Sequence, residues 1–408
     1  MVTDDPKIIT KKIKASFSCV YFRNTKWVLG ENLSDLTLIL LAAGDATRFK
    51  KGVKKQWIRI GSDPLWLKVA RNFEAMNIFE KIVIASHPDE IGYMRNFGCY
   101  TFTYGGDSRQ ASLKNALKEV DTPLVLVSDV ARACVTKDIC ERLLEKISDA
   151  ECVVPALKSS DTIYYDGRPA DREKFLRIQT PQLSRTDALR SALESTMLFT
   201  DESSAIYSDG GRVAFVDGDE SLHKLTFATD IKELPCLKNS SPDQTLCFTG
   251  NGYDVHAFEP GKKMVLCGIH IDVEYGFKAH SDGDVAIHAL IDALLGAAGM
   301  GDIGELFPDS DEKYAGADSG ELLKDVVSRL EHFGFDIVNA DLTIIAQQPR
   351  LSAYKNAMRE RLASLLGIKP AALNIKATTT EGLGFTGRKE GVAVSATATL
   401  KFHDWTEE

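Results

Sequence analysis

The chain of 408 residues is longer than one ordinary domain and fits two or three. Its hydrophobic content of 44% and charged content of 26% are typical of folded globular proteins, so each half can bury a core. The net charge of −9 argues against a nucleic-acid-binding protein, because phosphate backbones require a basic face, but it leaves room for a small phosphorylated substrate.

The eight cysteines are scattered and form no C-x-x-C pair. This spacing favours a reducing cytoplasm over a disulfide framework or a cysteine-based zinc site. No stretch approaches the roughly 18 uncharged apolar residues of a membrane helix. Residues 1–34 carry no usable motif, and the apolar run Ala15 to Phe22 is too short and too closely followed by Arg23 and Lys26 for a signal peptide. We therefore expect a cytoplasmic protein, with no membrane partner, that begins with an extension.

The first recognisable element is the uninterrupted apolar run Leu36 to Leu41, which predicts a strand buried on both faces. A loop of small residues follows it, and then the lysines between Lys50 and Lys55. Such a loop suits a polyphosphate, because backbone N–H groups can approach closely and the cations offset its charge. An ordinary solvated basic loop is the alternative for this segment taken alone.

Helices and strands then alternate along the first half. The patterns predict helices at 65–76, 108–118 and 136–147, strands at 81–86 and 124–128, and an extended run at 152–156. This order predicts a mostly parallel sheet with helices on both faces. Because ligands bind beyond the carboxyl ends of such strands, the loop at Gly44, the turn Gly105 to Ser112 and the stretch Asp129 to Arg132 are expected to converge on one cleft.

A polar stretch at 238–245, after Leu234-Pro235, reads as a short linker. We expect an extension at 1–34, a first domain at 35–236, a linker at 237–248 and a second domain at 249–408. The second domain mixes predicted helices at 319–333 and 352–366 with predicted strands at 340–346, 373–379 and 392–401, which favours an α+β layer fold.

The second domain contains a helix pattern in which charged residues share one stripe. Apolar residues from Val285 to Leu295 recur at the three-and-four spacing of a helix face. Asp284, His288 and Asp292 fall four apart, so they are predicted to lie on one side of that helix. A lone histidine on a helix is usually packed or exposed without a ligand. A histidine with an acid on each side along one stripe is, however, a pattern expected near a metal.

Two further candidate ligands precede this helix. If the segment around Asp254 and His256 is a strand, their side chains point to the same side, because side chains alternate with period two. Together with His288 they would form a three-ligand site. That set leaves the fourth tetrahedral position open, as a catalytic zinc requires.

Residues 250 to 402 resemble the 2-C-methyl-D-erythritol 2,4-cyclodiphosphate synthase family of the non-mevalonate isoprenoid pathway. The runs DVH, AHSDGDVAIHAL, GDIGELFPDSD and KATTTEGLGFTGR carry the resemblance, in this order. It implies that the 2-phosphate of a CDP-alcohol attacks the β-phosphorus and releases CMP and a cyclic diphosphate. Zinc, or another divalent transition metal, on Asp254, His256 and His288 would act as Lewis acid.

The same resemblance implies roles for further residues. His280 and Thr379 would stabilise the transition state, and Glu381 would hold a second ion, Mg²⁺, between the phosphates. We infer separately that Asp292 could orient the ring of His288, and an ordinary carboxylate on the helix surface is the alternative. The other expected substrate-binding residues are Ser281, Asp302, Ile303, Gly304, Phe307, Pro308, Asp309, Ser310, Asp311, Thr378 and Thr380, and Phe385 and Arg388 would line an apolar cavity on a trimer axis that could bind isoprenoid diphosphates.

Residues 36 to 235 resemble the 2-C-methyl-D-erythritol 4-phosphate cytidylyltransferase family. LLAAGDATRF, KKQW, GGDSRQAS, SDVAR, QTPQ, TDESSA and HKLT carry this resemblance. The family has glycine where Ala46 stands, proline where Lys54 stands, and a proline after Arg132, so loop geometry departs from the pattern while the charged residues remain. A fusion of these two enzymes in this order is itself known.

This second resemblance implies that a 4-phosphate attacks the α-phosphorus of CTP, with Mg²⁺, and expels diphosphate. Such transfers depend on positioning and charge neutralisation. The expected catalytic residues are Arg48, Lys55, Arg172 and Lys224, and the expected substrate-binding residues are Gly44, Gly105, Asp107, Ser112, Asp129 and Thr162.

The product of the first reaction needs phosphorylation before the second site can use it. No Walker-type phosphate loop is present, so a separate kinase must act between the two sites. The family likeness implies a trimeric second domain and a first domain that pairs, which together suggest a hexamer. Two alternatives stay open: a sugar-nucleotide pyrophosphorylase fused to the cyclase, and a degenerate first half that serves as scaffold or nucleotide sensor.

Overall fold

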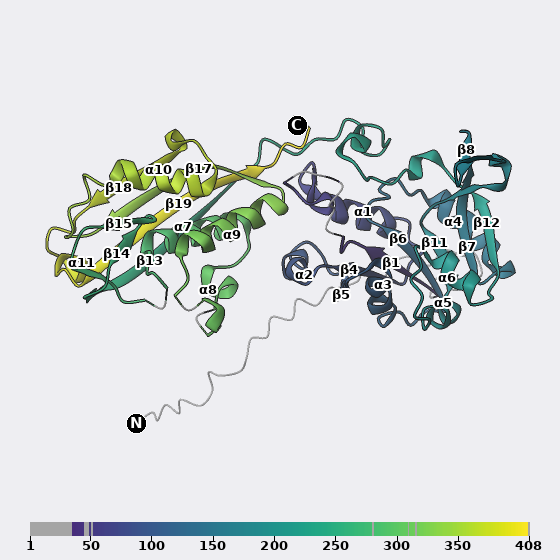
Figure 1. Cartoon of the computed structure of the whole chain (residues 1–408), viewed down its shortest axis with the longest axis horizontal. Coiled ribbons are helices and arrows are strands. Elements are labelled where there is room, and N and C mark those ends of the chain that lie inside the picture. Colours follow the sequence, from purple (N-terminus) through teal and green to yellow (C-terminus); the bar gives the residue numbers. More distant parts are fainter. Residues whose placement is uncertain are drawn as a thin grey trace, which may run out of the picture.

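The computed structural model describes residues 35–44, 49, 52–279, 281–308, 310–314 and 316–406. Figure 1 shows two α/β domains side by side, with the C-terminal end of the chain near their junction. The expected extension at 1–34 lies outside the described residues, as do the predicted site residues Arg48, His280 and Asp309. Within the described part, no helix is both long and apolar enough to cross a membrane.

The first domain is built on an eight-stranded sheet whose centre is the predicted apolar strand β1 (Leu36–Leu41). β1 pairs in parallel with β4 and with β6, and β4 pairs in parallel with β5, which confirms the expected parallel core. Beyond β6 the pairings of β11 and β10 are antiparallel, and β12 pairs in parallel with β7. The bounds are β4 Lys81–Ser86, β5 Thr101–Tyr104, β6 Leu124–Asp129, β7 Cys152–Lys158, β10 Leu176–Ile178, β11 Gln182–Arg185 and β12 Val213–Asp217.

Both faces of this sheet are covered. Leu38 and Leu40 of β1 belong to one buried cluster, whereas Ile39 and Leu41 belong to another, as alternation along a strand requires. The covering helices are α1 Leu65–Glu74, α2 Pro88–Met94, α3 Arg109–Leu117, α4 Lys137–Lys146, α5 Thr186–Ala192 and α6 Glu202–Ser208. The predicted helices at 65–76, 108–118 and 136–147 are therefore confirmed, with ends that differ by one or two residues.

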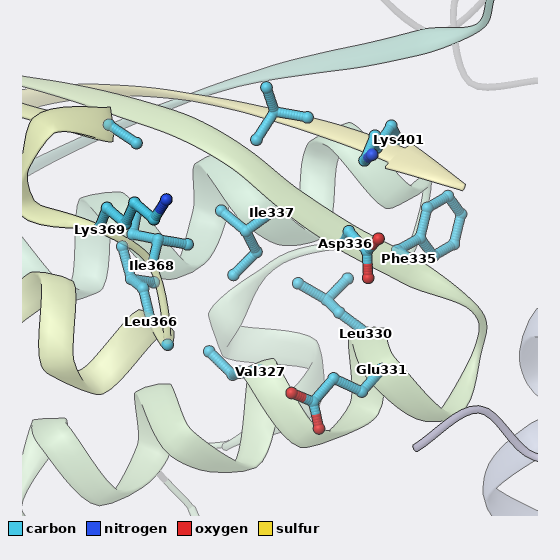
Figure 2. A pocket seen from close by; sticks show the side chains of 13 residues that line it. Val327, Leu330, Glu331, Phe335, Asp336, Ile337, Leu366, Ile368, Lys369 and Lys401 are labelled. Carbon is cyan, nitrogen blue, oxygen red and sulfur yellow. The ribbon is translucent and has the colours of Figure 1, made fainter. Parts of the chain in front are cut away.

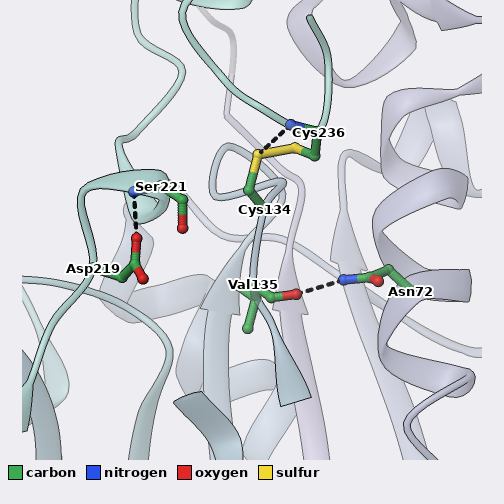
Figure 3. The surroundings of a disulfide bond; sticks show 6 residues. All are labelled: Asn72, Cys134, Val135, Asp219, Ser221 and Cys236. Carbon is green, nitrogen blue, oxygen red and sulfur yellow. Dashed lines mark hydrogen bonds between the residues drawn. A yellow bond between two sulfur atoms is a disulfide. The ribbon is translucent and has the colours of Figure 1, made fainter. Parts of the chain in front are cut away.

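A disulfide joins Cys134 and Cys236, which are 102 residues apart in sequence and 5.4 Å apart between Cα atoms (Figure 3). The backbone N–H of Cys236 also donates to the Sγ of Cys134. The expectation against disulfides is therefore wrong for this pair. The sequence carried no signal for it, because the fold and not a short motif brings the two residues together.

The second domain is a mixed sheet with helices packed against it, in agreement with the expected α+β fold. Its sheet has the order β16-β13-β19-β17-β18, antiparallel except for the parallel pair β17 and β18. The strands are β13 Cys247–Pro260, β16 Tyr275–Phe277, β17 Phe335–Ile345, β18 Leu373–Thr378 and β19 Gly391–Phe402, with a small hairpin of β14 Met264–Leu266 and β15 Ile269–Ile271. The helices are α7 Val285–Ala298, α8 Ile303–Leu306, α9 Ser319–His332, α10 Lys355–Leu366 and α11 Gly384–Gly387.

Helix α7 lies directly on strand β13. A Cβ atom added to Gly252 would lie 1.9 Å from the carbonyl oxygen of Ala289, so only glycine permits this approach. The side chain of Asp284 caps the helix by accepting hydrogen bonds from the N–H groups of Ala286 and Ile287. Close packing of these two elements brings the first turn of α7 beside the middle of β13.

The two domains meet at an aromatic junction. Trp57 of the first domain packs edge-on against Phe333 of the second, with ring centroids 4.6 Å apart. From α2, the hydroxyl of Tyr93 donates to the carbonyl oxygen of Ala298 at 2.9 Å. The stretch predicted as a linker also packs back on the first domain, because the N–H of Gly61 donates to the carbonyl oxygen of Ser241 at 2.8 Å.

Candidate functional sites

The three predicted metal ligands come together in the second domain. Asp254 and His256 lie on β13 and His288 lies on α7, and their ligand atoms all fall within 4.8 Å of one another. The Oδ2 atom of Asp254 is 3.2 Å from Nε2 of His256 and 3.4 Å from Nδ1 of His288. The convergence of these three side chains agrees with the strand and helix periodicities of the sequence.

The ring nitrogens that face away from this cluster have partners of their own. Nδ1 of His256 lies 2.8 Å from the carbonyl oxygen of Gly283, which leaves Nε2 facing Asp254. Nε2 of His288 lies 3.0 Å from Oγ of Ser319 and 3.4 Å from Oγ of Ser281. Partners of this kind fix the orientation of metal-binding imidazoles.

The electrostatics of the cluster favour an ionised carboxylate. Burial raises the pKa of Asp254, but hydrogen bonds from His256 and His288 outweigh burial and hold that pKa well below its usual range. Burial lowers the pKa of His256, but the hydrogen bond and charge of Asp254 outweigh it and raise that pKa. A divalent cation bound by these three side chains would take the place of the histidine protons that face Asp254.

Both acids predicted to share a stripe with His288 have other roles. Asp284 is fully buried and, besides capping α7, accepts hydrogen bonds from the N–H groups of Cys267 at 2.9 Å and Gly268 at 2.6 Å. The Oδ1 atom of Asp292 accepts from the N–H of Ile303 at 2.8 Å. Among the described residues Asp292 makes no hydrogen bond to His288. Ser281 and Ser319, and not Asp292, are the side chains that contact the outward ring nitrogen of His288.

Ser319 was missed as a site residue. It is fully buried, and its Oγ and N–H both donate to the carboxylate of Asp282. In the sequence it lies 31 residues from His288 and reads only as the start of a helix, so no spacing rule connects the two.

The predicted substrate-binding stretch after α7 forms one turn-rich segment. Asp302 caps α8 by accepting a hydrogen bond from the N–H of Glu305 at 2.9 Å. The N–H of Ile303, the first residue of α8, donates to the side chain of Asp292. Because α8 contacts α7, the segment adjoins the helix that carries His288. The same segment continues through the other predicted residues Gly304, Phe307, Pro308, Ser310 and Asp311.

The predicted group at the end of β18 lies elsewhere. In the sheet register Asp254 pairs with Val394, Val394 with Ile344, and Ile344 with Ala377. Three strand spacings separate Asp254 from Ala377, which is about 14 Å. The residues that follow Ala377, namely Thr378, Thr379, Thr380 and Glu381, therefore start well away from the metal cluster within one chain. The Phe385 to Arg388 region leads into β19, whose first residue Gly391 pairs with Ala257 of β13.

Within that distant group, Oγ1 of Thr379 donates to Oε1 of Glu381 at 2.8 Å. Thr380 donates to the carbonyl oxygen of Leu383 at 2.6 Å. Arg388 pairs with Glu390 at 2.7 Å. These are exposed contacts, so the carboxylate of Glu381 is accessible to a ligand.

In the first domain the loops that were predicted to converge lie next to one another at the carboxyl edge of the sheet. Asp129 ends β6 opposite Leu41, the last residue of β1. A Cβ added to Gly105 would lie 2.4 Å from that of Ala43 and 3.3 Å from Oγ of Ser112. The loop that holds Gly44 therefore adjoins the Gly105 to Ser112 turn, with Asp107 exposed within it.

Asp129 is the centre of a charge network at this edge of the sheet. It accepts from Nζ of Lys224 at 2.8 Å and from Nε of Arg109 at 3.3 Å. Arg109 also binds both carboxylate oxygens of the fully buried Glu202, at 2.6 and 3.3 Å. Burial raises the pKa of Asp129, but the two cations outweigh burial and hold it below its usual range. Arg109 and Glu202 were not predicted as site residues, although both stand inside quoted motifs.

The other predicted residues of the first domain divide into two groups. Nζ of Lys55 donates to the carbonyl oxygen of Leu225 at 3.0 Å, next to Lys224, so the two lysines lie in one region. Arg172 instead contacts the carbonyl oxygen of Ser160 at 2.7 Å beside the hairpin of β8 (Ile163–Tyr165) and β9 (Arg168–Ala170). Within the described chain, no hydrogen bond or ion pair links Arg172 or Thr162 to the Asp129 network.

A cavity of about 430 Å³ opens elsewhere on the second domain, between α9, β17 and the end of α10 (Figure 2). Leu330, Ile337 and Leu366 give it apolar walls, and Glu331 and Lys369 stand at its edge. None of the predicted site residues is among the described residues that line it. The metal cluster and the Asp129 network are therefore the two candidate sites.

Comparison with known proteins agrees with this division. Residues 36–234 match the 2-C-methyl-D-erythritol 4-phosphate cytidylyltransferase family, and residues 247–401 match the YgbB family. The bifunctional enzyme IspD/IspF of Sulfurovum sp. (strain NBC37-1) is 57% identical over 376 residues, which cover 92% of this chain and 100% of that protein.

Two further relatives are similar over almost the whole chain. The bifunctional enzyme IspD/IspF of Sulfurimonas denitrificans (strain ATCC 33889 / DSM 1251) is 56% identical over 93% of this chain and 98% of its own length. The solved structure of bifunctional IspDF from Campylobacter jejuni, 48% identical, superposes with a TM-score of 0.83 over 91% of this chain and 100% of that one. With both domains matched in the same order, the chain belongs to the family of bifunctional IspD/IspF enzymes.

Proposed function

We propose that this chain carries out two reactions of isoprenoid precursor synthesis at two separate sites. The first domain transfers a cytidylyl group from CTP to 2-C-methyl-D-erythritol 4-phosphate and releases diphosphate. The second domain converts the 2-phosphorylated CDP-alcohol into 2-C-methyl-D-erythritol 2,4-cyclodiphosphate and CMP. The single observation that carries the proposal is the likeness to bifunctional relatives across more than nine tenths of the chain, at up to 57% identity.

In the first site, the chain's own residues position CTP and neutralise its charge. Gly105 and Ser112 line the cytidine pocket, and Asp129 faces the ribose or the magnesium ion of CTP. Lys55, with Arg48, stabilises the charge that develops at the α-phosphorus, while Lys224, Arg172 and Thr162 hold the attacking phosphate. The close approach of Lys55 and Lys224 to Leu225 and Asp129 supports this arrangement.

Arg172 and Thr162 are separated from this network within one chain. In this proposal they act in a dimer, in which a second copy brings its hairpin to the cleft. Their exposed position and the contacts of Arg172 with Ser160 and Glu173 are compatible with this role.

In the second site, the donor set fits zinc. One carboxylate and two imidazoles converge, and each imidazole has its outward nitrogen occupied by a carbonyl or hydroxyl oxygen. Zinc bound there supplies Lewis-acid polarisation of a phosphate oxygen. Ser281 and the segment from Asp302 to Asp311 hold the substrate, and His280 and Thr379 stabilise the transition state.

Glu381 would hold a second ion, Mg²⁺, which would offset the charge of the substrate phosphates. Because Ala377 lies about 14 Å from Asp254 across the sheet, the Thr378 to Glu381 group serves the metal cluster of a neighbouring chain. In this proposal the cyclase domains form a trimer with Phe385 and Arg388 near its axis, as the family likeness implies, and pairing of the first domains gives a hexamer. A separate cytoplasmic kinase phosphorylates the intermediate between the two sites.

The first activity is tested by Lys55→Ala, with Lys137→Ala on the surface of α4 as the matched control. Diphosphate release is measured with methylerythritol phosphate and CTP, UTP or ATP. We expect turnover with CTP above that with UTP and ATP, and a loss of about 100-fold or more in Lys55→Ala only, because one transition-state charge contact typically contributes about 10²–10³. Full activity of Lys55→Ala would refute its role, and a preference for UTP would favour a sugar-nucleotide pyrophosphorylase.

The second activity is tested by His288→Ala, with His270→Ala as the control, since His270 is exposed on β15 of the same domain. CMP release from the CDP-alcohol 2-phosphate is the readout. We expect it to be abolished in His288→Ala and retained in His270→Ala. Equal loss in both variants would show that the effect is not specific to the cluster.

A further inference from the structure

The segment from Lys54 to Arg59, here called the lysine segment, is held from inside its own domain by one buried carboxylate. Glu90 on α2 is 2% exposed and accepts from Nζ of Lys54 at 2.7 Å. It also accepts from Nε2 of Gln56 at 3.1 Å and from Nε1 of Trp57 at 2.9 Å. Lys55, which lies between these residues, is the proposed catalytic lysine of the segment.

The other side of the lysine segment rests on the second domain. The turn His332 to Gly334 joins α9 to β17, and the carbonyl oxygen of His332 accepts from the N–H of Lys54 at 3.1 Å. The ring of Phe333 packs edge-on against Trp57. A Cβ atom added to Gly334 would lie 3.0 Å from the carbonyl oxygen of Trp57 and 3.2 Å from the side chain of Val53.

The far end of the segment is fixed by the same domain. The guanidinium of Arg59 lies 4.5 Å from the ring centroid of Phe402 and 5.2 Å from that of Phe335. The carbonyl oxygen of Arg59 accepts from Nε1 of Trp405 at 2.7 Å. Backbone atoms on both sides of Lys55 are therefore held across the domain junction.

We propose that the cyclase domain positions the catalytic lysine of the cytidylyltransferase domain through the turn His332 to Gly334. The turn contributes no group to either reaction. It sets the backbone position from which Nζ of Lys55 reaches the region of Leu225 and Lys224. Displacement of a reacting group by about 1 Å can cost about 100-fold in rate, so an intact turn is required for full cytidylyl transfer. The inference rests on the proposed role of Lys55.

The structure offers a matched pair of glycines for the test. Gly334 has φ +80° and its absent side chain faces Trp57 and Val53, whereas Gly367, which ends α10, has φ +69° and faces open space. Both belong to the cyclase domain, so alanine at either position introduces similar backbone strain. Only Gly334→Ala pushes against the lysine segment.

Both activities are measured on each full-length variant and normalised to the folded fraction from circular dichroism. For Gly334→Ala we expect kcat of cytidylyl transfer to fall at least about tenfold, with KM for CTP and cyclase turnover within about twofold of wild type. For Gly367→Ala we expect both activities unchanged. Phe333→Leu, which removes the ring under Trp57 but keeps an apolar side chain, is expected to lower the same kcat and covers the case in which Gly334→Ala does not fold.

Wild-type cytidylyl transfer in Gly334→Ala, or in Phe333→Leu if the first variant does not fold, would overturn the inference. Equal losses in Gly334→Ala and Gly367→Ala would also overturn it, since strain and not contact would then be the cause. Lys55→Ala separates the two proposals. If Lys55→Ala is inactive while Gly334→Ala is fully active, the lysine keeps its role and only the positioning by the cyclase domain is refuted.

Discussion

The Arg109–Glu202 ion pair allows a direct test of how far burial determines the stability of the cytidylyltransferase site. Glu202 is fully buried and binds Arg109 at 2.6 and 3.3 Å. Burial lowers the pKa of Arg109, but Glu202 and Asp129 outweigh burial and raise it, whereas for Glu202 burial outweighs the charge of Arg109 and raises the pKa of the carboxyl group. We consider Glu202→Gln, which keeps the shape of the side chain and one acceptor but removes the charge.

The magnitude follows from the environment of the pair. Removal of one partner from a fully buried pair typically costs about 3–5 kcal/mol. Arg109 is about a quarter exposed and keeps Asp129 as a second partner, and glutamine retains one hydrogen bond of about 1 kcal/mol. We therefore expect Glu202→Gln to lower the free energy of unfolding of the first domain by about 2 kcal/mol.

Urea unfolding followed by tryptophan fluorescence measures this change, because Trp57 and Trp66 are buried in the first domain. The control is Glu220→Gln, which breaks the Arg177–Glu220 pair of nearly the same length, 2.5 Å, but with both side chains more than half exposed. An exposed pair contributes at most about 1 kcal/mol and often nothing measurable. Equal destabilisation by the two variants would refute the argument that burial decides the difference.

Three other predictions concern single carboxylates. Because the pKa of Asp129 is lower in the folded chain than its unfolded value of about 4, the ionised carboxylate stabilises the fold above that pH. The difference in free energy of unfolding between wild type and Asp129→Asn, measured in urea, should therefore be constant from pH 5 to 8 and shrink below pH 4. Asp284→Ala leaves four backbone N–H groups without their acceptor and should cost about 2–4 kcal/mol in thermal unfolding of the cyclase domain. Asp292→Ala releases the N–H of Ile303 and should raise KM of the cyclase about fivefold with metal content unchanged, whereas Asp292→Asn keeps the acceptor and should not.

The parts of the structure that regular periodicity governs were predictable from the sequence. Alternation along a strand placed Asp254 and His256 on one side, and helix spacing placed His288 opposite them. The same rule failed for Asp284, because this residue is the N-cap with φ −69° and ψ 85° and does not occupy a helical position. Its side chain therefore turns inward to the amides of Cys267 and Gly268 and not along the stripe.

Contacts between distant segments were not predictable. Ser319 meets His288 across 31 residues and Glu202 meets Arg109 across 93, and no local pattern encodes either pair. Strand β11, with the sequence QLSR, is four residues long and has no apolar alternation, so the antiparallel part of the first sheet was missed. The Cys134–Cys236 disulfide belongs to the same class, because only the folded chain brings these residues together.

A divalent metal on Asp254, His256 and His288 is expected to be required for cyclisation and not for the structure of the first site. Protein stripped of metal is titrated with zinc in a buffer that supplies magnesium, and CMP release and cytidylyl transfer are followed in the same samples. We expect CMP release to rise linearly to a plateau at one zinc per chain, while cytidylyl transfer stays constant. Full CMP release from zinc-free protein, or a plateau unaffected by His288→Ala, would contradict it.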